Sequence, residues 1–452
     1  MRTPSPIKRS SRAVGTLPVD AAVALQGATI TSQSPLSFCT PEGQWCDAIS
    51  LSVDWPAANW IHRCDGTIRL RVEVVDGTLS VLALGEPGTS AIDEVRLGAA
   101  NQPVDIELVC MPLAACRSIV FRNGGGPSSC RATVHTIDYA EIGPSDTGDV
   151  LKSPDDLRLK AVAGWSRYYG DAPSTLAERR RIVRYRLTDR VKPMPWLEDL
   201  VVLIQPNDDL SRALYVSGLY EPSTMLALRR LLARGATFID VGANAGLFSL
   251  IASRWVGQSG RVYSFEPSAR EFGRLIDHVT LNRLSNIVPV HSAVTSSPGT
   301  ARLQVAPFPN AGHNTLGSSF AYPTVAAVRT ETVTTTSLDR FAAEARLSRI
   351  DVIKMDVEGS EHAALAGATE VLRRFRPALI VEISRSALAG CGNSPEQILE
   401  LLGSARYKAY RIGDSAELIP LRDDDVGAET NLAALPVEHR HRHSSPVKGK
   451  VG

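Results

Sequence analysis

Apolar and polar residues alternate in several short segments of the first third of the chain. Residues 68–74 alternate between aliphatic and mainly charged side chains, and an Asp76-Gly77 turn leads into a second alternating run at 79–81. Further strand-like segments lie at 104–110, 119–121 and 132–137. A period of two is typical of strands that bury one face, so we predict a hairpin at 68–81. Several such strands joined by turn residues predict a β-sandwich-like module over residues 29–143.

In the second half of the chain, apolar residues follow the helical period instead, with stripes at 272–279 and 365–372. Short apolar runs suited to strands alternate with the helices, at 237–241, 261–265, 287–291, 350–355 and 378–383. Alternating strands and helices predict an α/β domain with a mostly parallel sheet that helices cover on both faces. We place this domain at 201–425 and expect residues 407–412 and 418–421 to form its closing antiparallel hairpin.

Three remaining segments lack a sustained period. Residues 1–28 and 426–452 are rich in Ser, Pro, Arg or His, and we predict that both are disordered tails. Residues 144–200 are polar and helical in tendency, so they are predicted to form a helical linker. Its arginine-rich run at 178–186 is interpreted as a solvated helix face, with an anionic-acceptor site as the alternative.

A glycine-containing turn follows the strand at 237–241 and precedes a helix. It reads Asp-Val-Gly-Ala-Asn-Ala-Gly over residues 240–246, and it lacks both the dinucleotide fingerprint and the phosphate-loop pattern. Asp240 would repel a pyrophosphate but suits a ligand that carries an ammonium and a sulfonium. Glu266 follows the next strand, where an acid can accept hydrogen bonds from two ribose hydroxyls. The glycine turn together with Asp240 and Glu266 predicts an S-adenosylmethionine site. The simpler alternative is that the two acids cap the helices that follow them.

These residues resemble the FkbM family of S-adenosylmethionine-dependent methyltransferases. The family's hallmarks, D-x-G-A-N-x-G and a later K-x-D-V-E-G, correspond to residues 240–246 and 354–359. Further matches occur at 220–222, 265–267, 337–339 and 376–382, so the resemblance covers roughly residues 200–385. It implies a class I methyltransferase domain of Rossmann-like fold. It also implies, usually, methylation of a hydroxyl on a sugar, glycolipid or polyketide-like metabolite.

The resemblance also implies roles for single residues. Asp356 and Glu358 would lie near the acceptor, at the mouth of the site. The residues that would bind the cofactor are Asp240, Gly242, Asn244, Gly246, Glu266 and Glu221.

Attack by a hydroxyl requires that its proton be removed, so a base is expected beside the acceptor. Asp356 is the leading candidate, because it follows the strand at 350–355, at the edge where ligands bind in open α/β sheets. His313 lies in a loop rich in Pro and Gly and is the second candidate, with a solvent-facing histidine as the alternative. Asp356, Glu358 and Glu361 could raise one another's pKa, hold a divalent cation, or form an acid-rich helix start. No metal site is predicted.

Composition limits the classes of partner. The formal charge of +1 over 452 residues gives no general attraction to nucleic acid or to an anionic membrane. We find neither a signal peptide nor a run of about 18 apolar residues, so we expect no transmembrane segment and a cytoplasmic protein. The expected partner is a small-molecule or glycan acceptor, and a homo-oligomer is possible.

Cysteines and tryptophans gather in the first part of the chain. No C-x-x-C pair occurs, so we interpret the cysteines as small buried side chains rather than zinc ligands. Six of the seven lie in the first third, namely Cys39, Cys46, Cys64, Cys110, Cys116 and Cys130. Trp45, Trp55 and Trp60 could stack on sugar rings, although a place in the core is the simpler interpretation.

The sequence therefore predicts an S-adenosylmethionine-dependent O-methyltransferase. Two alternatives remain open. The first is an N- or C-methyltransferase, which does not strictly need a proton-abstracting carboxylate. The second is a noncatalytic glycan-binding protein with a vestigial cofactor fold.

Overall fold

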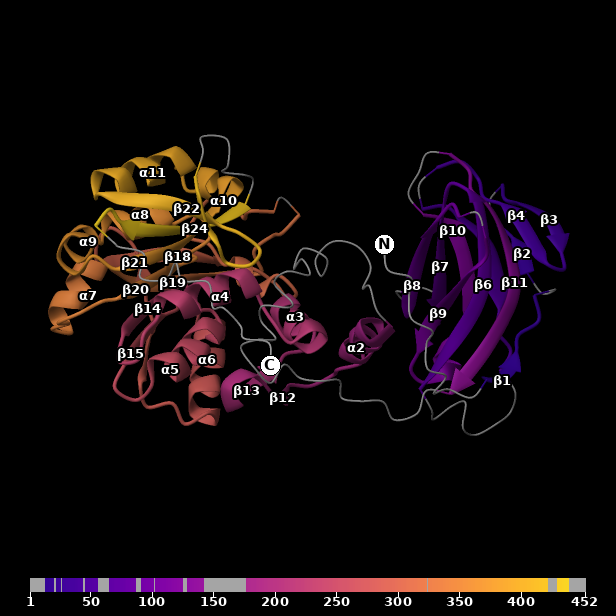
Figure 1. Cartoon of the computed structure of the whole chain (residues 1–452), viewed down its shortest axis with the longest axis horizontal. Coiled ribbons are helices and arrows are strands. Elements are labelled where there is room, and N and C mark those ends of the chain that lie inside the picture. Colours follow the sequence, from indigo (N-terminus) through magenta and orange to yellow (C-terminus); the bar gives the residue numbers. More distant parts are fainter. Residues whose placement is uncertain are drawn as a thin grey trace, which may run out of the picture. The chain divides into compact units, whose positions relative to one another are not determined.

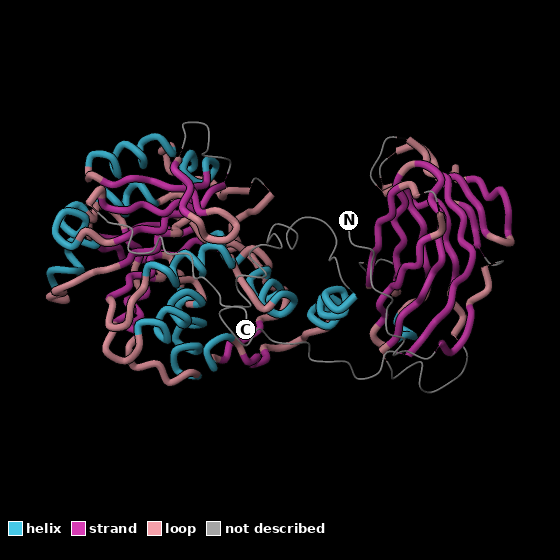
Figure 2. The backbone as a smooth tube through the Cα atoms, viewed as in Figure 1, coloured by secondary structure: helices cyan, strands magenta, loops and turns pink. Residues whose placement is uncertain are grey.

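The computed structural model describes residues 13–19, 22–25, 27–43, 45–55, 65–86, 91–100, 102–124, 128–141, 176–322, 324–421 and 429–438. These residues form two units. The first contains the described residues up to 141 together with 176–189 and 215–217, and the second contains the others. Strands dominate the first unit, whereas helices and strands mix in the second (Figures 1 and 2).

The first unit contains two antiparallel sheets. One sheet has the order β3 (Thr29–Gln33), β4 (Leu36–Cys39), β11 (Arg131–Glu141), β6 (Gly66–Asp76) and β9 (Val104–Cys110), with β1 (Ala13–Thr16) also paired to β11. The other has the order β2 (Ala22–Ala24), β5 (Asp47–Ser52), β10 (Ser118–Asn123), β7 (Thr78–Leu84) and β8 (Asp93–Gly98).

Both sheets contribute to one apolar core. Phe38 of β4 and Phe121 of β10 are buried, and their ring centroids lie 5.4 Å apart. Trp55 packs edge-on against Tyr139 and donates a hydrogen bond to the Cys116 carbonyl, which fits a place at the core. Trp45 is 42% exposed. Trp60 and Cys64 lie outside the described residues.

The predicted hairpin at 68–81 is wrong. Strand β6 pairs with β9 and β11, whereas β7 pairs with β8 and β10 of the other sheet. The chain crosses between the sheets at Gly77, whose φ of +75° suits glycine. Alternation gives each strand one buried face, but it does not decide whether two successive strands pair or face each other across a core.

Both predicted tails contain paired strands, so the disorder predicted for 1–28 and 426–452 is wrong over those strands. Strand β1 pairs with β11 and β2 pairs with β5. Near the other end, β24 (Glu429–Pro436) pairs with two strands of the second unit. Pairing satisfies the backbone groups of segments whose own sequence pattern is too short to predict a strand.

The predicted linker 144–200 is described from residue 176 onward, and only part of it is helical. Helix α2 (Leu176–Arg186) packs on β9, and its Val183 is buried against Val109 and Met111. The arginine-rich run is therefore not solvated on every side. Strand β12 (Lys192–Pro195) pairs with β13 (Val201–Ile204) in the second unit.

The second unit is built on an eight-stranded sheet, and the predicted mixture of helices and strands is confirmed. Its first five strands are parallel and its last three antiparallel. The order is β16 (Ile287–Val290), β15 (Arg261–Phe265), β14 (Thr237–Val241), β20 (Val352–Met355), β21 (Ala378–Ser384), β24, β22 (Tyr407–Ile412) and β23 (Leu418–Pro420). A small sheet joins β17 (Ala293–Val294), β19 (Arg329–Thr336) and β18 (Gly299–Val305).

Helices accompany this sheet, with α5 on β14 and β15, and α8 and α11 on β21 and β22. Among the described residues, we find no helix whose length and apolar content would let it cross a membrane. Because β14, β15, β20 and β21 are parallel, their carboxyl ends meet at one edge of the sheet. The helices are α3 (Asp209–Ser217), α4 (Pro222–Leu231), α5 (Leu247–Val256), α6 (Ala269–Leu281), α7 (Leu338–Glu344), α8 (Glu361–Ala366), α9 (Thr369–Phe375), α10 (Arg385–Gly390) and α11 (Pro395–Ser404).

A buried histidine of α6 hydrogen-bonds both to the loop after β14 and to strand β13. His278 of α6 accepts a hydrogen bond from the Leu203 backbone N–H at Nε2 and makes a second with the Ala245 carbonyl at Nδ1, each 2.7 Å long. The two bonds require the neutral imidazole with its proton on Nδ1. Burial lowers the pKa of His278 to about 4.

We predict that His278 makes the protein sensitive to acid. The unfolded chain takes up a proton near the ordinary histidine pKa, whereas the folded chain resists it down to about 4. Stability is therefore lost as the pH falls between these values, by about 2 kcal/mol from pH 7 to pH 5. Urea unfolding of wild type and His278→Gln at both pH values tests this. The difference between the two proteins should shrink at pH 5, and an unchanged difference would contradict the prediction.

Candidate functional site

The turn after β14 allows two strands to approach closely. Gly242 has φ +80°, and a Cβ there would collide with the carbonyl oxygen of Asp356, which follows β20. Gly246 has φ +89°, and a Cβ there would collide with the Leu275 side chain. Between them, Asn244 also adopts a left-handed conformation, with φ +50°. Both glycines are therefore required by packing within the protein, which the sequence pattern did not reveal.

Glu266 ties the same turn to the end of β15. Its two carboxylate oxygens accept hydrogen bonds from the backbone N–H groups of Asn244 and Ser268, each 2.8 Å long. Burial raises the pKa of Glu266 to about 8, although the two N–H groups act in the opposite direction. The structure thus places Glu266 beside the predicted cofactor residues of the turn.

Asp240 lies beneath the turn with its side chain completely buried. The Ser249 hydroxyl donates to its Oδ2 at 2.6 Å, and Ser249 also bonds with Ser264. The other oxygen, Oδ1, has no hydrogen-bond partner among the described residues. Burial raises the pKa of Asp240, and the Lys354 ammonium opposes this effect.

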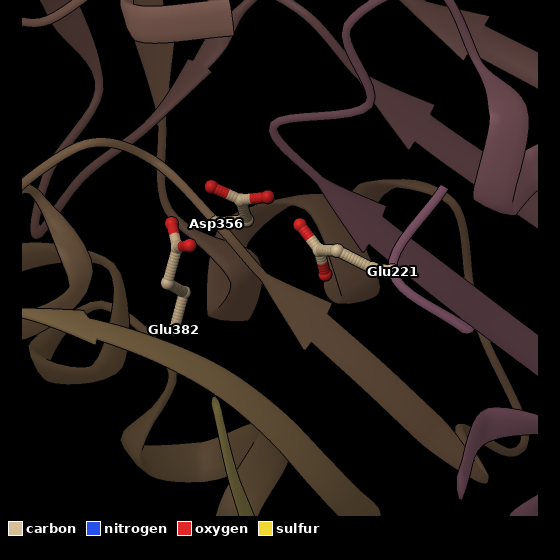
Figure 3. Close-up of side chains that lie close together, drawn as sticks. All are labelled: Glu221, Asp356 and Glu382. Atoms are coloured by element: carbon tan, nitrogen blue, oxygen red, sulfur yellow. The ribbon is translucent and has the colours of Figure 1, made fainter. Parts of the chain in front are cut away.

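Three carboxylates from separate segments lie together at the carboxyl edge of the sheet (Figure 3). They belong to Glu221 at the start of α4, Asp356 after β20 and Glu382 in β21, and their nearest oxygens lie within 4.8 Å of one another. We call these residues the carboxylate cluster. Asn431 of β24 donates a hydrogen bond of 3.5 Å to Glu221. The side chains are half-buried, so a ligand could reach them.

Lys354 supplies a positive charge to the carboxylate cluster. Its side chain is 3% exposed, and its Nζ donates to Asp356 Oδ2 at 2.8 Å. Burial would lower the pKa of Lys354, but the carboxylates of Asp356, Asp240 and Glu221 outweigh burial and raise it. Burial would raise the pKa of Asp356, but the Lys354 ammonium and a hydrogen bond with Glu382 lower it overall.

A histidine and a glutamate from two loops form a second polar pair. Nδ1 of His313 lies 2.8 Å from Oε1 of Glu358, and the His313 ring packs edge-on against Tyr322. The Thr315 hydroxyl donates to the Glu358 carbonyl at 2.7 Å. Both members act electrostatically on the carboxylate cluster, because His313 lowers the pKa of Asp356 and Glu358 raises that of Glu382.

The structure groups the predicted residues in a partly different way. Asp240, Gly242, Asn244, Gly246 and Glu266 lie together at the turn after β14. Glu221, which was grouped with them, lies beside Asp356 and Glu382.

Sequence reasoning missed Glu382 as a site residue. The available signal was a single charged side chain inside the apolar run of β21. Glu361 accepts hydrogen bonds from the backbone N–H groups of Val357 and Gly359, as expected for an acid at a helix start.

The glycine turn, the acid after the second strand and the acids at the carboxyl edge lie where open α/β sheets bind their ligands. The family model described as "Methyltransferase FkbM domain" matches residues 240–412. The chain thus carries a domain of the FkbM methyltransferase family, which confirms the resemblance seen in the motifs. The family implies use of S-adenosylmethionine.

Known proteins similar to this chain include the hexuronic acid methyltransferase AglP of Haloferax volcanii. That protein is 27% identical over 195 residues, which are 42% of this chain and 70% of the relative. The methyltransferase FkbM of Methylobacillus flagellatus is 16% identical, with a TM-score of 0.30 and coverage of 62% of this chain and 58% of that one. An S-adenosylmethionine-dependent O-methyltransferase from Thermotoga maritima is 14% identical, with a TM-score of 0.28 and coverage of 49% and 67%. TM-scores this low do not establish a common fold.

We predict that Gly242→Ala destabilises the protein by at least about 2 kcal/mol, because alanine would be strained at positive φ and would collide with Asp356. Gly273→Ala in α6 is the matched control, since a Cβ there meets nothing within 4 Å. The control should gain about 0.5–1 kcal/mol. Urea unfolding measures both variants, and equal effects would contradict the proposed close approach.

We also predict that Lys354→Met lowers stability by about 3–5 kcal/mol at pH 7, because it leaves buried carboxylates without their cation. Asp356→Asn in the same chain should restore part of the loss, since it removes one uncompensated charge. Urea unfolding of both single variants and the double variant measures this coupling. Strictly additive effects would show that the two side chains do not form an interacting pair.

Proposed function

We propose that this protein transfers a methyl group from S-adenosylmethionine to a hydroxyl of a sugar or related metabolite. The observation that carries the proposal is the carboxylate cluster, which adjoins the glycine turn at the edge where parallel strands end. Similarity to a hexuronic acid methyltransferase supports a sugar acceptor. N- or C-methylation and a noncatalytic glycan-binding role are the alternatives.

The residues of the turn fit S-adenosylmethionine. Asp240 has one buried oxygen without a partner, and a carboxylate in that state favours a cationic or hydrogen-bonding ligand nearby. Glu266 is held by two backbone N–H groups and can still accept hydrogen bonds from ribose hydroxyls. When bound, the cofactor supplies an electrophilic methyl group on a sulfonium.

The edge of the sheet supplies the other requirements of the reaction. A hydroxyl attacks well only as its proton leaves, so a carboxylate within reach of the acceptor accelerates transfer. The carboxylate cluster meets this need, and the His313–Glu358 pair offers a second proton acceptor next to it. Orienting the hydroxyl and excluding water are the remaining tasks, for which we propose the loop around His313.

For the first unit, we propose a β-sandwich-like module that supports the acceptor or an oligomer. Trp45 is exposed, and the Arg96 guanidinium lies over its ring, 4.3 Å from the ring centroid. An exposed aromatic ring with a cation beside it is suited to a polar ring ligand such as a sugar.

Calorimetric titration of the full chain tests the proposal. S-adenosylmethionine and its demethylated product should bind, whereas NAD should not. Glu266→Ala should weaken both by about 10- to 100-fold, because two ribose hydroxyls lose the carboxyl group to which they would hydrogen-bond. Glu344→Ala on α7 is the control, since that side chain is exposed.

Methylation of D-glucuronic acid and D-glucose is measured next, from release of the demethylated product. Binding of neither cofactor species to the folded protein would overturn methyl transfer and favour the noncatalytic alternative. Binding with methylation of an amine or carbon acceptor, but of no hydroxyl, would overturn the choice of acceptor.

A further inference from the structure

The three members of the carboxylate cluster are held in different ways. Asp356 accepts a hydrogen bond from the buried Lys354 ammonium at 2.8 Å. Protonating Asp356 would remove the counter-charge in direct contact with that ammonium, in a place from which water is largely excluded. Asp356 is therefore fixed as a carboxylate, and its charge is already compensated. A carboxylate in this state is a weak base.

Glu382 faces negative rather than positive groups. Asp356 and Glu221 each have a carboxylate oxygen within 4.8 Å of one of its own. Carboxyl groups this close together in a half-buried place do not all ionise easily, so one of them tends to keep a proton. Because Lys354 keeps Asp356 ionised, that proton belongs to Glu382. Burial and the Asp356 carboxylate raise the pKa of Glu382 well above its usual range.

Other neighbours do not reverse this assignment. Asn431 of β24 is the strand neighbour of Glu382 and is neutral. The described titratable groups that interact with Glu382 or with its neighbour Asp356 are Lys354 in β20, Asp240 in β14, Glu221 before α4, Glu361 at the start of α8, and Glu358 and His313 in the loops. Lys354 also provides a cation to the cluster, so an ammonium and a proton together offset two of its three carboxylates.

We propose that Glu382 is the catalytic base that accepts the hydroxyl proton, and that Lys354 and Asp356 are positioning residues that tune it. The inference rests on the proposed methyl transfer and deepens it. A carboxyl whose pKa is raised is, once ionised, a stronger base than Asp356, whose pKa is lowered. Half-buried at the sheet edge, Glu382 is within reach of an acceptor.

The step is balanced without a further reactant. Glu382 first releases its own proton to solvent. The acceptor O–H bond then breaks and its proton bonds to the Glu382 carboxylate, while the oxygen electron pair forms the new bond to the methyl carbon. The bond between that carbon and sulfur breaks, and its electron pair stays on sulfur.

Steady-state kinetics with S-adenosylmethionine and D-glucuronic acid test the assignment. In wild type, kcat/KM should rise with pH as Glu382 loses its proton. Glu382→Gln should lower kcat about 100-fold or more and abolish this rise, with cofactor affinity unchanged. Asp356→Asn should shift the rise to lower pH, because the negative neighbour is gone and Lys354 is free to attract Glu382. Glu344→Gln is the control for the same chemical change at an exposed site.

Infrared difference spectroscopy provides a readout without an acceptor. The carbonyl band of a protonated carboxylic acid should decrease at neutral pH in Glu382→Gln and not in Glu344→Gln. If instead Asp356→Asn decreases this band and Glu382→Gln leaves it unchanged, the proton belongs to Asp356 and the proposal is overturned. Failure of wild type to bind S-adenosylmethionine would overturn the proposed function, whereas the infrared result would still locate the proton.

Discussion

The ion pair between Lys354 and Asp356 is the interaction on which the site depends. It places one ammonium beneath several carboxylates that would otherwise repel one another in a half-buried space. In register across the sheet, Lys354 lies opposite Asp240, so the same charge acts on the turn after β14 and on the carboxylate cluster. Loss of this cation would therefore change the protonation of groups on both sides of the site.

Close backbone approach is the second constraint. The end of β20 reaches its position because Gly242 lacks a Cβ, and the Asp356 N–H donates to the Val241 carbonyl at 3.0 Å. The turn after β14 and Asp356 are thus held at a fixed separation by backbone contacts, which are stiffer than contacts between side chains. A methyl donor and a proton acceptor need this kind of fixed separation, since small displacements of reacting groups are costly in rate.

Motifs predicted the turn well because its determinants lie within a few residues of one another. Asp240, Gly242 and Gly246 have conformational and electrostatic properties that can be recognised from the sequence. Glu382 was not recognised because its partners come from distant segments, and the sequence of β21 alone shows only a charged residue in an apolar strand. The same limit explains β24, which inserts between β21 and β22 out of chain order.

Local backbone strain occurs at or beside the carboxylates at the sheet edge. Glu221 precedes α4 with φ 42°, and Glu358 follows β20 with φ 49°, although neither is glycine. Asn244 in the turn has φ 50°. Each such residue costs on the order of 1–3 kcal/mol, and strain of this kind persists only where the surrounding structure enforces it.

Here the enforcing structure is identifiable at two of the three positions. The Asn244 N–H is held by Glu266, and the Glu358 carbonyl is held by the Thr315 hydroxyl. Glycine at either position would relieve the strain but would discard the side chain. Short left-handed turns after a strand or before a helix bring polar side chains to the sheet edge without lengthening the loops. The strained conformations are thus explained as the means by which separate segments deliver polar groups to one small volume.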